Sequence, residues 1–209
     1  MRLVIPLLVF LTACSPSATI APTVTDETSP ATIELPISFY IVDEAGGGTQ
    51  SVLSSERDVD SLTDMLTDMQ LVWDQAGIML TTTTITRIEA SAEALSALSL
   101  GDTASFLSDV YSGATEVPNP GAVNGFYVRD LGTINGVAPF GTRAFFVTDE
   151  PSVHDERVSS HEIGHILGLH HNRDDSGRLM FSGTNGMALV KAEISTARYT
   201  AEGIIDGSR

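Results

Sequence analysis

Three histidines and one glutamate near residue 165 have the spacing of a metal site. His161 and His165 are four residues apart, and Glu162 follows the first of them directly. Because an α-helix turns once in 3.6 residues, both imidazoles would project from one face and could bind one ion at about 2.0–2.1 Å. The pattern therefore predicts a zinc-binding helix, with the Glu162 carboxylate within reach of a water at the ion.

A third ligand follows from the glycine after this helix. Gly168 can adopt the left-handed conformation that ends a helix and turns the chain away. That turn would bring His171 back to the ion, whereas a straight helix would carry it nearly two turns further along. Three neutral nitrogens leave a fourth position for water, which is the arrangement of a catalytic zinc site rather than of a closed structural one. The neighbouring His170 and the earlier His154 are not expected to bind the ion.

The residues from His161 to His171, HEIGHILGLHH, resemble the HExxHxxGxxH motif of the metzincin metallopeptidases and match all five of its defining positions. The resemblance implies a zinc endopeptidase that hydrolyses peptide bonds of proteins with a metal-activated water. One zinc ion would be held by the three histidines, and Glu162 would be the general base.

The same resemblance implies several supporting features. Met180 would lie in a structural turn beneath the metal, and the peptide would lie extended beside an edge strand at 136–140. The segment from 171 to about 187 would shape the pocket for the residue after the cut. Phe181 and Ser182 follow Met180, so the tyrosine ligand that some subfamilies place there is absent. The subfamily, matrixin-like or similar, stays open.

Composition limits the function classes. The 209 residues include 27 Asp and Glu against 11 Lys and Arg, for a formal net charge of −16. A nucleic-acid partner is therefore excluded, since a phosphate-binding surface needs clustered basic residues. The 42% hydrophobic content is ordinary for a globular protein. We expect a monomer with a single folded domain.

The N-terminal segment reads as a targeting signal. Residues 1–13 hold one basic residue and a short apolar run, which is typical of a secretory signal. Residues 11–14, Leu-Thr-Ala-Cys, resemble the lipobox of bacterial lipoproteins, so Cys14 is the expected lipidation site. A secretory signal with an incidental cysteine is the alternative. Residues 14–32 would form a flexible tether and 33–209 the catalytic domain, in a bacterial cell envelope, at the outer membrane if the source is Gram-negative.

Periodicity predicts the fold. Residues 37–41 alternate as in a strand, residues 62–73 have helical spacing, and strands are expected at 78–88, 125–130 and 143–148. One or two short helices are expected at 91–112, and a capping pair, Ser152 with Asp155, would begin the metal-binding helix. This order indicates an α/β (α+β) fold with a mixed, mostly parallel sheet. The resemblance adds a metzincin-like catalytic domain with an active-site helix and a C-terminal helix at about 189–198.

Two functions from other classes remain open. A surface-binding lipoprotein could carry a zinc site without catalysis, although it would not need a general base at Glu162. A zinc-acquisition lipoprotein would use histidines on flexible or interdomain surfaces. Zinc content and peptide cleavage would distinguish these from a peptidase.

Overall fold

The computed structural model describes residues 31–113 and 118–208. The expected signal, Cys14 and nearly all of the tether lie outside these residues. Within them, no helix is long and apolar enough to cross a membrane. The strands are β1 (Ile33–Glu44), β2 (Ile78–Ala90), β3 (Val123–Val128), β4 (Gly136–Val137) and β5 (Ala144–Thr148). The helices are α1 (Val59–Trp73), α2 (Ala92–Ser99), α3 (Thr103–Gly113), α4 (Asp155–Ile166) and α5 (Lys191–Ile205), with a 3-10 turn at Asp74–Ala76.

The five strands form one sheet in the order β2-β1-β3-β5-β4. β1 pairs in parallel with β2 and β3, and β3 pairs in parallel with β5. Only β4 is antiparallel, and it forms the edge of the sheet beside β5. The prediction of a mixed, mostly parallel sheet is confirmed. The edge segment expected at 136–140 is a two-residue strand, Gly136–Val137, followed by a turn.

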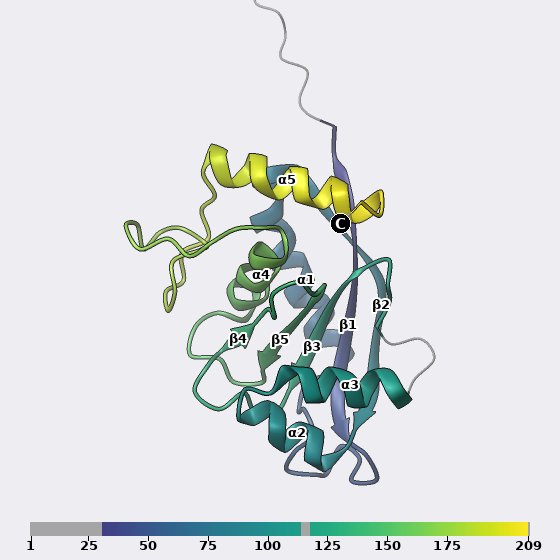
Figure 1. Ribbon diagram of the computed structural model, residues 1–209. Coiled ribbons are helices and arrows are strands. Elements are labelled where there is room, and N and C mark those ends of the chain that lie inside the picture. Colours follow the sequence, from purple (N-terminus) through teal and green to yellow (C-terminus); the bar gives the residue numbers. More distant parts are fainter. Residues whose placement is uncertain (1–30, 114–117, 209) are drawn as a thin grey trace, which may run out of the picture.

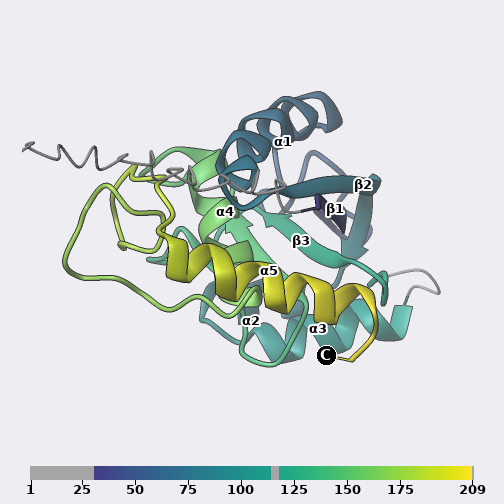
Figure 2. The ribbon, with the colours of Figure 1, turned by 90° about the horizontal axis from the view of Figure 1, so that it is seen from above.

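Helices cover both faces of the sheet and give the molecule three layers (Figures 1 and 2). The larger core lies between the sheet and α1, α4 and α5, while a second core lies between the sheet and α2 and α3. β3 and β5 are buried along their whole length, as central parallel strands are. In Figure 1, α5 crosses the end of the sheet at which β1 begins. There Arg198 donates to the carbonyl oxygens of Ala76 and Ala31, both at 2.7 Å.

α1 and α4 begin in different ways. α1 is capped by Asp58, whose carboxylate accepts from the Ser61 N–H at 2.7 Å. α4 begins after His154, with no side-chain cap. Ser152 instead bonds Asn135 in the loop before β4, because its N–H donates to Asn135 Oδ1 at 3.0 Å. The predicted capping role of Ser152 is therefore wrong, and this residue joins α4 to the edge-strand loop.

Candidate metal centre

The turn at Gly168 ends α4 and redirects the chain as predicted. Gly168 has φ +83°, in the left-handed region. The Leu169 N–H donates to the Gly164 carbonyl at 2.8 Å, and the Gly168 N–H donates to the His165 carbonyl at 3.0 Å. These two bonds define a Schellman motif, which satisfies the last carbonyls of the helix. The chain therefore leaves the helix axis three residues before His171.

The turn brings the three predicted ligands together. The Nε2 atoms of His161 and His171 are 3.1 Å apart, and those of His165 and His171 are also 3.1 Å apart. Two nitrogens held by one zinc ion at about 2.05 Å with tetrahedral angles would be about 3.3 Å apart. Within the described residues, this is the one group of three or more His, Cys, Asp or Glu that could hold a metal. Its spacing fits the coordination shell of a single zinc ion.

The hydrogen-bond partners of Nδ1 show which ring nitrogen carries the proton in two of the histidines. His161 Nδ1 is 2.8 Å from the Leu179 carbonyl, and His165 Nδ1 is 3.0 Å from the Leu169 carbonyl. A carbonyl oxygen can only accept, so each Nδ1 carries the hydrogen. In the neutral imidazole each Nε2 then presents a lone pair to the centre of the cluster. Two lone pairs directed at one point in this way repel each other unless a proton or a cation lies between them, and a metal ligand commonly has its other N–H held as here.

Burial favours the neutral state that metal binding requires. Removal from water lowers the pKa of His161 to about 3 and also lowers the pKa of His165. His161 is buried, His165 is half-buried and His171 is exposed. At neutral pH the two helical histidines are therefore ready to bind a metal without first losing a proton.

Glu162 lies beneath the edge strand. Its side chain is 5% exposed, and burial raises the pKa of the carboxyl to about 8. The nearby backbone of Ala138 acts in the opposite direction and lowers the pKa of this carboxyl. A Cβ built on Gly136 would be 3.0 Å from Glu162 Oε1, so the absence of a side chain there gives the carboxylate its space. β4 and the turn after it therefore set the position of Glu162.

Met180 packs under α4. It is fully buried, and a Cβ built on Gly164 would lie 2.6 Å from the Met180 sulfur. Gly164 lies between the two helical histidines in sequence, so the contact is directly behind the cluster. The Met180 carbonyl also accepts from the Asn172 N–H at 2.8 Å. Since Asn172 follows His171, this bond fixes the third histidine relative to the methionine turn.

The cluster opens into a cavity of about 850 Å³. Its lining includes the three histidines, Glu162 and the edge segment from Gly136 to Thr142, with Ser182 and Gly183 on the segment after α4. His170 is exposed and belongs to the cavity lining, but it is not part of the three-histidine cluster. His154 is not part of the cluster either. An extended peptide would find both the edge strand and the histidines within this cavity.

The structure adds participants that the sequence analysis did not identify. The Leu179 carbonyl, next to Met180, accepts from both His161 and Arg157. Arg157 precedes His161 by four residues and is buried with it. The role of a backbone carbonyl cannot be recognised from the type of its residue. Arg157 could have been recognised, because it is a charged residue one turn before His161 on a helix that was expected to be buried.

A substitution at Gly168 is expected to affect both folding and zinc binding. Gly168→Ala forces a Cβ into the left-handed region, which costs about 1–2 kcal/mol in the free energy of unfolding. That Cβ would also meet Thr200 Oγ1 of α5 at 3.2 Å. Because the turn carries His171, we expect weaker zinc binding, measured by competition with a chromophoric chelator. Gly46→Ala is the matched control, since Gly46 has φ +76° with no neighbour within 4 Å. Equal zinc affinity in both variants would show that the turn does not place the ligand.

Comparison with known proteins gives matches by structure. No family model matches the chain, and no curated protein matches its sequence. The crystal structure of archaemetzincin from Methanopyrus kandleri is 14% identical, with a TM-score of 0.52 over 82% of this chain and 96% of that chain. Metalloproteinase-II from Bacteroides fragilis is 20% identical, with a TM-score of 0.49 over 81% of this chain and 54% of that one. The chain thus spans about half the length of the second protein. The chain has a metzincin-like fold, with a three-histidine cluster at the end of its fourth helix.

Proposed function

We propose that this protein is a zinc-dependent endopeptidase that hydrolyses peptide bonds of protein substrates. The observation that carries the proposal is the convergence of the Nε2 atoms of three histidines with a carboxylate, Glu162, in one open cavity. A structural zinc site would be closed by a fourth protein ligand. Among the described residues, no fourth His, Cys, Asp or Glu joins the cluster. The metzincin-like fold and the motif from His161 to His171 agree with this function.

Each group at the site has a task in peptide hydrolysis. His161, His165 and His171 would hold the zinc, which when bound supplies a Lewis acid for the scissile carbonyl and lowers the pKa of water to about 7. Glu162 takes the proton from the attacking water and passes it to the leaving amine. The backbone of Ala138 beside the Glu162 carboxylate favours its ionised form. The positive charge of zinc would stabilise the ionised carboxylate, which is the form that accepts the proton.

The edge strand provides a surface for the substrate backbone. β4 pairs with β5 on one side only, so its other side has backbone groups available for an extended peptide. The same segment lines the cavity from Gly136 onward. A peptide added to this edge would run past the histidine cluster, which would place one of its carbonyls near the metal and Glu162.

Removal of zinc tests this function directly. The chelator-treated protein is expected to lose cleavage of a mixed peptide library, read by mass spectrometry, and to regain it when about one zinc ion per chain is added. The zinc-loaded protein is also expected to melt at a higher temperature than the metal-free protein, because zinc binds the folded state. If the reloaded protein holds one zinc ion and cleaves no peptide, the site is a non-catalytic one.

Anchoring of the domain is a separate proposal that rests on residues 1–14 alone. We propose that Cys14 is lipidated and that the domain lies in a bacterial cell envelope. The similarity of residues 11–14 to a lipobox supports it.

A further inference from the structure

Arg157 is a buried cation in the wall of the metal cavity. It lies on α4 four residues before His161, about 6 Å along the helix axis. The residue is only 4% exposed, yet it belongs to the cavity lining with Glu162 and the histidines. Arginines are almost never buried to this extent unless they are paired. The partners of its guanidinium group therefore matter.

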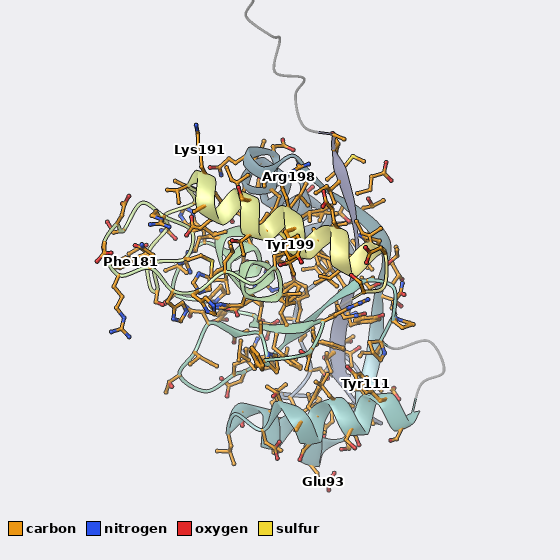
Figure 3. The ribbon with its side chains drawn as sticks, turned by 45° about the horizontal axis from the view of Figure 1, so that its top comes forward. Glu93, Tyr111, Phe181, Lys191, Arg198 and Tyr199 are labelled. Atoms are coloured by element: carbon orange, nitrogen blue, oxygen red, sulfur yellow. The ribbon has the colours of Figure 1, made fainter. Side chains whose placement is uncertain are left out.

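Those partners are backbone carbonyls and not carboxylates. Nη2 donates to the Leu179 carbonyl at 2.8 Å and to the Phe181 carbonyl. Figure 3 labels Phe181 in the segment between α4 and α5. Nε is buried without a hydrogen-bond partner, and Nη1 makes no hydrogen bond with the described residues. No carboxylate in the described part of the chain forms an ion pair with Arg157.

A buried charge without a counterion is costly. Two carbonyls satisfy part of the guanidinium group but do not neutralise it, so the folded protein retains much of the desolvation cost. The acidic group whose charge acts on Arg157 is Glu162, which is needed for proton transfer. A carboxylate that entered the cavity could pair with the guanidinium in the bidentate geometry that arginine favours. The unpaired charge thus points to an anionic group on the ligand.

The charge of the cavity supports the same conclusion. The whole chain has 27 acidic residues against 11 basic ones, but the cavity lining has Glu162 as its one acidic residue and two arginines, Arg143 and Arg157. A cavity with more basic than acidic residues, on a protein that is acidic as a whole, is suited to a substrate group of negative charge.

We propose that Arg157 makes this site selective for substrates with an acidic side chain beside the scissile bond. The inference rests on the proposed peptidase function and names the class of substrate that it acts on. Arg157 would hold the aspartate or glutamate side chain on the side of Ser182 and Gly183, while the adjoining carbonyl lies at the histidines. The two carbonyl bonds hold the guanidinium in place before the substrate arrives.

Matched peptide pairs test the proposal. Peptides cleaved from a mixed library are remade with Glu against Gln and Asp against Asn at each position flanking the cut. We expect the zinc-loaded wild type to prefer the acid by about 10-fold or more in kcat/KM at one of the two positions adjoining the cut, the size of a charge-assisted hydrogen bond. In Arg157→Gln this ratio should fall to near one, and Arg157→Lys should restore part of it.

A control separates local recognition from general charge. Lys191 is exposed and lies outside the cavity lining, so Lys191→Gln also removes one positive charge and should keep the wild-type ratio. A wild-type ratio near one at both adjoining positions would overturn the proposal, whether or not the Arg157 variants fold. So would an acid preference that persists in a folded Arg157→Gln protein that binds zinc.

A binding measurement separates this proposal from the proposed function. The zinc-loaded Glu162→Ala protein is titrated by calorimetry with the same acid and amide peptides. If the wild type cleaves nothing, library peptides that this variant retains are remade in acid and amide forms and used instead. Tighter binding of the acid form, by the same factor, supports the role of Arg157 even if the wild type cleaves nothing and the peptidase function fails. Equal binding of acid and amide forms, together with cleavage by the wild type without acid preference, leaves the peptidase function standing and refutes the role of Arg157.

Discussion

Glu162→Ala is expected to lower kcat for peptide cleavage by about 10²–10⁴-fold while the protein keeps one zinc ion. In the proposed mechanism the three histidines would still hold zinc in this variant, while the group that takes the proton from water would be lost. Glu162→Gln keeps the size of the side chain and should lose activity to a similar degree, since an amide cannot accept the proton. Steady-state kinetics and zinc analysis of the same samples measure both quantities.

Glu156→Ala is the control for this result. Glu156 lies in the first turn of the same helix and outside the cavity lining. Its loss should leave kcat close to that of the wild type. Activity that persists in Glu162→Ala with zinc bound would remove Glu162 from the mechanism, whereas loss of zinc from that variant would mean that the carboxylate is a ligand.

His171→Ala is expected to weaken zinc binding by more than about 100-fold and to abolish cleavage at limiting zinc. Loss of a supporting group around a metal ligand typically costs 10–100-fold in affinity, so loss of a direct ligand should cost more. The Nε2 atom of His171 is 3.1 Å from the Nε2 atoms of both other histidines. His171→Ala therefore removes the nitrogen that lies next to both of the others. Competition with a chromophoric chelator measures the affinity.

The adjacent histidine provides a strict comparison. His170 has the same chemistry and differs by one position in the chain, but it lies outside the cluster. His170→Ala should bind one zinc ion with wild-type affinity. If the two variants lose zinc equally, the turn at Gly168 does not select between them, and the assignment of the third ligand is wrong.

The spacing of residues was enough to predict much of the site. The four-residue separation of His161 and His165 requires a shared helix face, and Gly168 is the residue type that permits the left-handed turn. The order of periodic segments also predicted a mixed, mostly parallel sheet. These features depend on local backbone geometry, and the spacing of residue types in the sequence reflects that geometry.

The remaining features depend on contacts between distant segments. Arg157 reaches carbonyls 22 and 24 residues away, and the backbone of Ala138 reaches Glu162 from the edge strand. Ser152 fits the pattern of a helix cap but bonds Asn135, because the loop before β4 offers a competing partner. Backbone carbonyls and competing partners are set by tertiary packing, so residue types alone do not reveal them.

Anomalous diffraction at the zinc edge, from crystals of the zinc-loaded protein, tests the central claim that three histidines hold one zinc ion beside an open cavity. The account predicts one strong peak at about 2.0–2.1 Å from Nε2 of His161, His165 and His171, with the side facing the cavity free of any protein ligand. The absence of a peak at these nitrogens, or a fourth protein group that closes the shell, would contradict it.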